Sequence, residues 1–283
     1  LRLHLFRDLL LLVLFAVGTL VIANYLLILD VRRDMALNQI SQAKGHLREE
    51  MRRLLEPVAQ QLAIMRDQGL AGDLSREDSL RLTASLMPTM RNLPQVSGLS
   101  VTDQAGGQYF LQRDGDEWLI RLRAQGDEGK VTWRRWDLAA PDSESWQETL
   151  TYDPLQRDWY QQAVEHVDSD TISWSRPYIF YTRAVPGITA STAWREGDAV
   201  LVVALDVTLS TILDTIDSLA LGDQGRGFMF RSDGAVYLSQ TVQAEQAPDD
   251  VSDGRFFSAG SHGGTLAIDA VAAWQRHGRP EQQ

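Results

Sequence analysis

The sequence contains no cysteine, which excludes disulfides, thiolate metal sites and cysteine nucleophiles. Proline and glycine are not enriched, with 9 and 21 residues in 283, so wholesale disorder is not expected. Positive charge is scarce: 27 lysines and arginines stand against 38 acidic residues, and the formal net charge is −11. A uniformly acidic protein repels phosphate backbones, so nucleic acid is excluded as the expected partner. The length allows one large folded domain or two small ones.

Sequence motifs of common enzyme classes are missing as well. There is no His-Glu-x-x-His, no phosphate-binding glycine loop with lysine and serine, and no Gly-x-Ser-x-Gly elbow. The five histidines are scattered and form no metal-ligand cluster. We therefore expect that this chain is not an enzyme and that it needs neither a cofactor nor a metal.

Residues 9–29 form a long apolar stretch. They read LLLLVLFAVGTLVIANYLLIL, which is 21 residues without a charge. A helix rises about 1.5 Å per residue, so this length spans the roughly 30 Å hydrocarbon core of a bilayer. A cleavable signal peptide is the alternative, but its apolar part is normally shorter and ends at small residues. We predict a transmembrane helix at 9–29 after an N-terminal stub of residues 1–8.

Helical periodicity follows this stretch. From Asp34 to about Gln68, apolar residues recur at mostly three- and four-residue steps, as in an amphipathic helix. The apolar stripe consists of Leu37, Ile40, Leu47, Met51, Leu54, Val58, Leu62 and Met65. A long helix of this kind suits a signalling stalk, and its stripe could pack on its own domain or on a second copy. Gly69 and Gly72 should end this helix, and a second helix is expected from Ser75, which with Asp78 forms a capping box. Residues 30–89 are thus predicted to contain the long N-terminal helix and a second helix.

Between about residues 90 and 215 the period changes to two, which is typical of β-strands. Glycine- and aspartate-bearing turns separate the runs, as in an antiparallel meander. The expected strands are 98–103, 108–111, 118–122, 133–136, 147–152, 178–182, 187–194 and 199–206. An amphipathic helix follows at 209–216. A shorter strand, turn and strand at 228–238 begins a second module, which we expect to be incomplete within residues 216–283.

Residues 152–160, Tyr-Asp-Pro-Leu-Gln-Arg-Asp-Trp-Tyr, combine helix-start signals with ligand-binding side-chain types. Asp153 is a good N-cap and Pro154 a good first helical residue, so a helix is expected to begin there. Its first two turns would project Arg157, Trp159 and Tyr160. An arginine can hold a carboxylate by two parallel charge-assisted hydrogen bonds, and aromatic faces attract an ammonium group.

Asp206 ends the most apolar of the expected strands, where a carboxylate could receive an ammonium group. A purely structural interpretation of these residues remains open. Asp153 and Arg157 are four residues apart and could pair on a helix surface. Trp159 could be a core residue, and Asp206 could cap the helix that follows.

At these residues the sequence resembles the double Cache family of extracytoplasmic sensor domains. The motifs that carry the resemblance are Asp153-Pro154-x-x-Arg157-x-Trp159-Tyr160, Trp174-Ser175-x-Pro177-Tyr178, Pro186-Gly187-Ile188-Thr189, and Val200 to Asp206 leading into Leu209. The resemblance implies an α/β (α+β) fold, in which a long N-terminal helix precedes two PAS-like modules with antiparallel sheets. The membrane-distal module, 90–215, would hold the ligand, and the membrane-proximal one would be 216–283.

The resemblance also implies a place in the cell. Sensors of this family sit in the periplasm and are anchored in the bacterial inner membrane, so residues 1–8 would be cytoplasmic and the protein would be a homodimer. The effector of a chemoreceptor, a histidine kinase or a cyclic-nucleotide enzyme would follow downstream.

One subset of the family binds α-amino acids, and its motif falls on Tyr152, Arg157, Trp159, Tyr160, Tyr178 and Asp206. In that subset the arginine, the tryptophan and the second tyrosine serve the carboxylate. The two other tyrosines and the aspartate serve the ammonium group, and Tyr181 is an alternative to Tyr178. The expected ligand is therefore an amino acid or a similar small zwitterion. The alternatives are an organic acid, an amine or a purine in the same fold, or an interaction module with a vestigial pocket.

Overall fold

The computed structural model describes residues 2–74, 79–115, 117–126, 129–136 and 144–217, together with short strands at 229–230, 235–237 and 257–258. The chain divides into two compact units, residues 1–49 and residues 50–283.

The first unit consists of the N-terminal part of helix α1 (Arg2–Leu70). The helix predicted at 34–68 is confirmed, because α1 includes all of these residues. Within the described part of the chain, no helix combines the length and the apolar character needed to cross a bilayer. The transmembrane helix at 9–29 is therefore not confirmed and stays a prediction.

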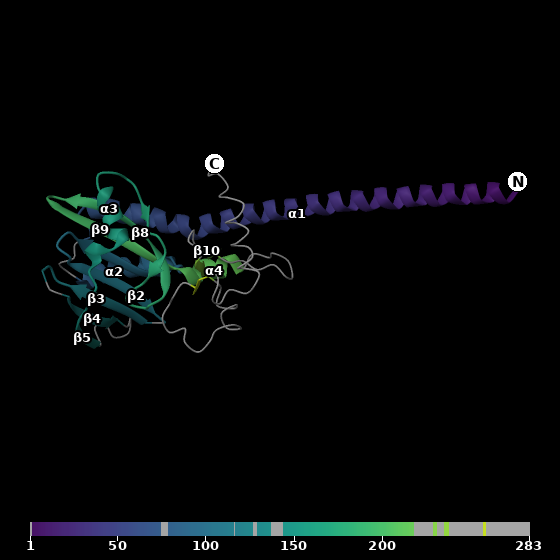
Figure 1. The fold of residues 1–283 in the computed structure, drawn as a ribbon. Coiled ribbons are helices and arrows are strands. Elements are labelled where there is room, and N and C mark those ends of the chain that lie inside the picture. Colours follow the sequence, from purple (N-terminus) through teal and green to yellow (C-terminus); the bar gives the residue numbers. More distant parts are fainter. Residues whose placement is uncertain are drawn as a thin grey trace. The chain divides into compact units, whose positions relative to one another are not determined.

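The second unit contains an antiparallel sheet of nine strands among its described residues. The strands are β1 (Val96–Asp103), β2 (Gln108–Asp114), β3 (Glu117–Arg123), β4 (Lys130–Trp136), β5 (Glu144–Thr149), β6 (Ser173–Trp174), β7 (Tyr178–Ile179), β8 (Pro186–Glu196) and β9 (Ala199–Thr208). Their order is β5-β4-β3-β2-β1-β9-β8-β6, and β7 also pairs with β8 (Figure 1). The predicted antiparallel meander is thus confirmed. The pairing of β1 with β9 joins the strands β1 to β5 to the remaining strands at the centre of the sheet.

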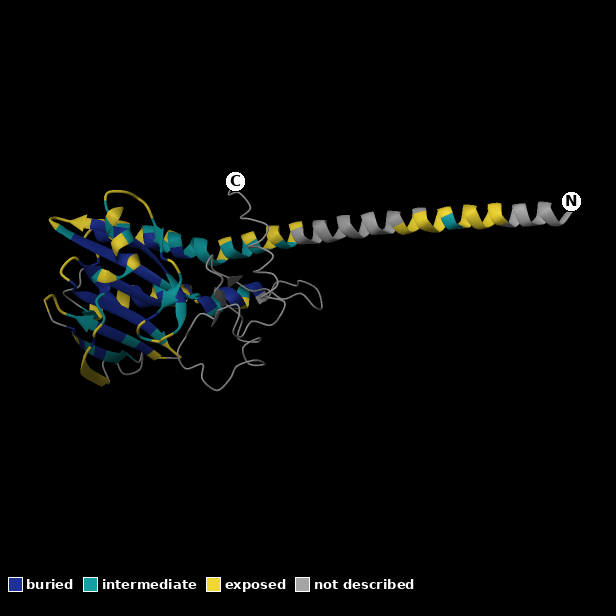
Figure 2. Ribbon diagram, in the orientation of Figure 1, coloured by how far each residue is buried: buried dark blue, intermediate teal, exposed yellow. Residues whose placement is uncertain are grey.

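One face of this sheet is apolar and is covered by α1 and α2 (Ser79–Asn92). Trp194 of β8 lies against α1, where a Cβ atom added at Gly69 would be 2.3 Å from the indole ring. On β2, the Tyr109 hydroxyl shares a 2.8 Å hydrogen bond with Thr83 of α2. Side chains alternate along a strand, so every second residue of these strands lies on this face. Most of these residues in the central strands are apolar. They include Leu99, Val101, Leu111, Val203 and Leu205, all buried. Figure 2 shows buried residues along the strands of the sheet.

The C-terminal part of the apolar stripe on α1 belongs to this core. Val58, Leu62 and Met65 are all 0% exposed. This confirms, for that half of the helix, the interpretation in which the stripe packs on its own domain. Burial of three such side chains removes a large apolar surface from water, which ties the end of α1 to the sheet.

The opposite face of the sheet is partly covered by α3 (Asp158–Glu165), which packs on β8 and β9. Trp159, Tyr160 and Ala163 of α3 form a core cluster with small side chains of these two strands. Beyond α3 the face carries buried polar groups, which are Ser100, Gln108, Gln112, Arg121 and Thr189. Burial of polar side chains costs free energy unless they have hydrogen-bond partners. These polar residues therefore mark this part of the sheet as a candidate binding surface.

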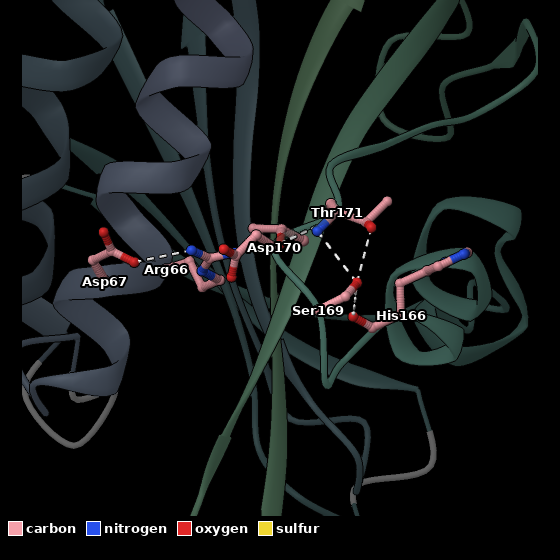
Figure 3. Close-up of polar contacts among 7 residues, drawn as sticks. Arg66, Asp67, His166, Ser169, Asp170 and Thr171 are labelled. Atoms are coloured by element: carbon pink, nitrogen blue, oxygen red, sulfur yellow. Dashed lines mark hydrogen bonds and ion pairs between the residues drawn. The ribbon is translucent and has the colours of Figure 1, made fainter.

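The loop after α3 connects this face with α1, as Figure 3 shows. Arg66 of α1 forms an ion pair with Asp170 at 2.9 Å. The Ser169 hydroxyl lies within hydrogen-bonding distance of the His166 carbonyl oxygen (2.9 Å) and the Thr171 hydroxyl (2.8 Å), which fixes the path of the loop. The elements that cover the two faces of the sheet are therefore linked by a polar contact at its edge.

Helix α4 (Leu209–Asp217) confirms the amphipathic helix predicted at 209–216. Most of the predicted second module, 216–283, lies outside the described residues. Within them, β10 (Met229–Phe230), β11 (Ala235–Tyr237) and β12 (Phe257–Ser258) form an antiparallel sheet. The two strands predicted within 228–238 are confirmed by β10 and β11, the turn predicted between them lies outside the described residues, and β12 was not predicted. The predicted domain boundaries and the incompleteness of the second module stay predictions.

Candidate functional site

The helix predicted from Asp153 is split into two parts in the structure. A 3₁₀ turn, η1 (Pro154–Gln156), comes first, and the Asp153 carboxylate caps it by accepting a 3.0 Å hydrogen bond from the Leu155 N–H. The α-helix begins one residue after Arg157, whose backbone is extended at φ −86° and ψ 138°. Because Arg157 lies at this junction, its side chain is not held to the helix surface.

Arg157 lies against aromatic rings and has no carboxylate partner among the described residues. Its guanidinium carbon is 4.9 Å from the centre of the Tyr178 ring and 5.6 Å from that of Tyr152. Its side chain makes one hydrogen bond within the described part of the chain, from Nη2 to the Ile179 carbonyl oxygen, which is long at 3.5 Å. The alternative surface pair with Asp153 does not form, because that carboxylate accepts from η1 instead. Arg157 is thus a half-buried cation held by π-systems.

Asp206 faces the polar side of the sheet. The alternative interpretation, in which Asp206 caps the helix that follows, is wrong, because Asp206 does not cap α4. Strand β9 continues past it to Thr208, whose own hydroxyl accepts from the Thr211 N–H. The Thr189 hydroxyl of the paired strand donates to Asp206 Oδ1 at 2.6 Å. Burial raises the pKa of Asp206 to about 6, and the Thr189 hydrogen bond and the positive charges of Arg121 and Arg157 oppose that rise.

Tyr178 completes a short chain of hydroxyls that ends at this carboxylate. Its hydroxyl oxygen is 2.7 Å from Thr189 Oγ1. Thr189 has one proton to give and gives it to ionised Asp206, so Tyr178 is the donor to Thr189. Burial, and after it the charge of Asp206, raises the pKa of Tyr178, which keeps the phenol protonated.

A cavity opens beside these groups, with about 490 Å³ of empty space including its mouth. Its lining residues are Ser97, Gly98, Ser100, Gln108, Phe110, Gln112, Arg121, Tyr152, Trp159, Tyr178, Phe180, Tyr181, Thr182, Arg183 and Asp206. Small-molecule sites typically combine aromatic walls with a few convergent polar groups, as this lining does. Gly98 preserves the space, because a Cβ atom there would be 3.0 Å from Asp206 Oδ2 and 3.1 Å from the Phe110 ring.

The structure brings four of the six predicted site residues into this lining: Tyr152, Trp159, Tyr178 and Asp206. Arg157 stands next to the lining, in contact with two of its tyrosine rings. Tyr160 lies apart, since it is 7% exposed and packs in the core cluster of α3. The alternative residue Tyr181 also lines the cavity, with its ring 5.0 Å from that of Tyr152.

Arg121 of β3 is the main residue of the cavity that the sequence did not identify. It is 2% exposed, and its guanidinium donates to Gln108 Oε1 at 3.0 Å and to Thr182 Oγ1 at 3.1 Å. The available signal was an arginine in the middle of the apolar run Trp118-Leu119-Ile120-Arg121-Leu122. Burial lowers the pKa of Arg121, and the neighbouring Tyr152 and Asp206 act in the opposite direction.

A scan of the sequence finds no matching family model, and a comparison with curated proteins finds no matching relative. Solved structures do show similarity. The ligand-binding domain of the Pseudomonas aeruginosa PAO1 amino acid chemoreceptor PctB, in complex with L-Gln, is 19% identical over 71% of this chain and 66% of that chain, with a TM-score of 0.47. The chain therefore spans just under two thirds of that structure.

Two further similar structures are chemoreceptor domains from other species. That of Pseudomonas fluorescens CtaA, in complex with L-serine, is 21% identical over 74% of each chain, with a TM-score of 0.42. That of Campylobacter jejuni Tlp3, in complex with 4-methylisoleucine, is 14% identical over 76% of this chain and 75% of that chain, with a TM-score of 0.39. These neighbours are ligand-binding sensor domains, the class that the sequence motifs resemble. At these identities and TM-scores, the function of this chain has to be argued from its own site.

Proposed function

We propose that this chain is the ligand-binding sensor part of a bacterial transmembrane receptor and that its cavity binds an amino acid or a similar small zwitterion. One observation supports this most: the guanidinium of Arg157, which has no carboxylate partner among the described residues, and the carboxylate of Asp206 stand at a single cavity. A zwitterion carries both complementary charges, so its binding would give each of these groups a charged partner away from water. The proposed activity is binding, without chemical conversion.

In this proposal the two ends of the ligand meet different elements of the fold. The ammonium group lies against Asp206, beside the hydroxyl chain of Thr189 and Tyr178. The carboxylate lies toward Arg157, which its extended backbone and its two tyrosine contacts hold next to the cavity. Tyr160 acts from the core by fixing α3, and the indole of Trp159 forms part of the cavity wall.

The cellular setting belongs to the same proposal. The uncharged stretch 9–29 anchors the chain in the bacterial inner membrane, and the sheet domain lies in the periplasm as part of a homodimer. In support, many apolar side chains of this stretch are exposed in the monomer, including Phe15 at 78% and Leu20 at 70%. Apolar surface of this kind is stable in lipid and unfavourable in water.

The test is calorimetric titration of the full chain, purified in mild detergent, with each of the standard amino acids at neutral pH. We expect saturable binding of at least one of them. Arg157→Ala and Asp206→Asn should each weaken that binding by about tenfold or more, as expected for a lost charge-assisted contact. Arg195→Ala is the matched control, because Arg195 pairs with exposed Asp168 away from the cavity.

A small organic acid is the second candidate ligand, since guanidiniums outnumber carboxylates around the cavity. A thermal-shift screen separates the two, because a ligand that binds the folded state raises its apparent stability by mass action. The amino-acid proposal would be contradicted if carboxylic acids without an ammonium group stabilise the chain and no amino acid does.

A further inference from the structure

Arg121 is a buried cation whose charge is not balanced by contact with a carboxylate of the described residues. Its polar partners, Gln108 and Thr182, are neutral, and its Nε atom is buried without a hydrogen-bond partner in the described part of the chain. Its guanidinium carbon also lies 4.7 Å from the ring centre of Phe110 and 4.9 Å from that of Tyr152. A charge buried in this way is expensive unless an anion reaches it.

The register of the sheet places Arg121 on the floor of the cavity. Arg121 pairs with Phe110 across β3 and β2, and Phe110 pairs with Ser100 across β2 and β1. All three line the cavity, as does Asp206 on β9, the strand next to β1. Arg121 thus enters the cavity from β3, whereas Arg157 approaches it from the η1–α3 junction.

The charges around the cavity do not match a neutral amino acid. Asp206 is the one carboxylate among its described lining residues. Three guanidiniums among the described residues line the cavity or contact its tyrosine rings, and that of Arg183 is paired with Asp114 at 3.2 Å. Those of Arg121 and Arg157 remain, so two cations stand against one anion. A neutral zwitterion satisfies Arg157 and Asp206 and leaves Arg121 without a counter-charge.

We propose that Arg121 selects for an acidic amino acid by binding its side-chain carboxylate. This inference rests on the proposed function of the same cavity and names the class of ligand. Such a ligand has two carboxylates and one ammonium group, which is the complement of two guanidiniums and one carboxylate. Arg121 suits the second carboxylate because a guanidinium fork matches carboxylate geometry and stays charged when buried.

The test compares acidic amino acids with their amides, which have almost the same shape. The full chain in mild detergent is titrated with L-glutamate and L-glutamine, and with L-aspartate and L-asparagine. At least one acid should bind about tenfold or more tightly than its amide, the size of a lost contact to a charged group. Equal or tighter binding of both amides by the unmodified chain would overturn the inference and leave the proposed function standing.

Variants assign the preference to Arg121. Arg121→Gln should weaken binding of the acid far more than binding of the amide and so abolish the preference for the acid, because the amide does not use the charge. Arg121→Lys keeps the charge and should retain part of the preference, which gives a result even if the glutamine variant does not fold. Arg135→Gln is the control on the neighbouring strand, since Arg135 pairs with Glu117 and Glu144 outside the cavity.

Two outcomes count against Arg121 in different ways. An equal loss of acid and amide binding in a folded Arg121→Gln variant would overturn the inference, because it would make Arg121 an anchor for the carboxylate common to all amino acids. If none of the four ligands binds and no other standard amino acid binds, both the inference and the proposed function are overturned.

Discussion

The Thr189 hydroxyl donates a 2.6 Å hydrogen bond to Asp206 across the paired strands β8 and β9. This contact favours the ionised form of a carboxylate whose pKa burial raises to about 6. The ammonium group of a ligand would complete its compensation. The state of Asp206 therefore connects the stability of the empty domain with its ability to bind.

The stability of the ligand-free domain should fall as pH rises from about 4 to about 6 and should level off above that. The pKa of Asp206 is about 6 when folded and has its ordinary value near 3.8 when unfolded, so in this window the folded state holds a proton that the unfolded chain has released. The loss should be roughly 2–3 kcal/mol. Denaturant unfolding monitored by tryptophan fluorescence across this range measures it.

Asp206→Asn isolates this contribution, because the amide cannot titrate. The difference in unfolding free energy between the unmodified chain and the variant should change across the same pH window. A difference that stays constant with pH would show that Asp206 has its ordinary pKa in the folded state.

Gly98→Ala should weaken ligand binding more than it weakens the fold. The added methyl would lie 3.0 Å from Asp206 Oδ2 and 3.1 Å from the Phe110 ring, so these two lining side chains must shift to admit it. We expect about a tenfold loss of affinity in calorimetry. Gly45→Ala is the control, since a Cβ atom there meets nothing within 4 Å. Unchanged affinity in the Gly98 variant would mean that the ligand binds elsewhere.

Met65→Ala should lower the free energy of unfolding by about 2–5 kcal/mol, the usual cost of truncating a fully buried side chain. Met65 is 0% exposed, whereas its neighbour Ile64 is 51% exposed. Ile64→Ala should therefore change stability by about 0.5 kcal/mol or less. Equal effects of the two substitutions in urea unfolding would contradict the packing of the end of α1 into the sheet domain.

Asp170→Asn should cost less than about 1 kcal/mol, although it removes the ion pair with Arg66. The Asp170 side chain is 95% exposed, and the attraction between exposed charges is weak in water. Asp168→Asn, in the same loop and with its own exposed arginine partner, should give a similar small value. A loss of several kcal/mol for Asp170 alone would identify this contact as a major support of the loop.

The sequence predicted the strands of the sheet well because local signals mark them. Gly115 and Gly197 have positive φ values of 63° and 60°, and each lies at the turn of a hairpin between runs of alternating residues. Strands β6 and β7 are two residues long and carry no periodicity, so the two-residue β6 was not predicted and the run at 178–182 was expected to be longer than β7. The position of β9 beside β1 depends on non-local pairing, which no local pattern reveals.

The same distinction applies to the candidate site. The motif around Arg157 and the position of Asp206 were predicted, because they follow local helix and strand signals. Arg121 was not, since an arginine inside a strand can face solvent or core, and the register with β2 decides which. The extended backbone of Arg157 was also not predicted, because Asp153 and Pro154 signal a helix start without specifying that it is a single 3₁₀ turn.

The most direct test of the central claim is a titration in which one end of the ligand is deleted at a time. The amino acid that binds most tightly to the full chain is compared with the analogue that lacks its ammonium group and with the analogue that lacks its α-carboxylate. If Arg157 and Asp206 bind opposite ends of one ligand, each deletion should weaken binding by about tenfold or more. An analogue without the ammonium group that binds as tightly as the amino acid would contradict the role of Asp206 and with it the proposed mode of binding.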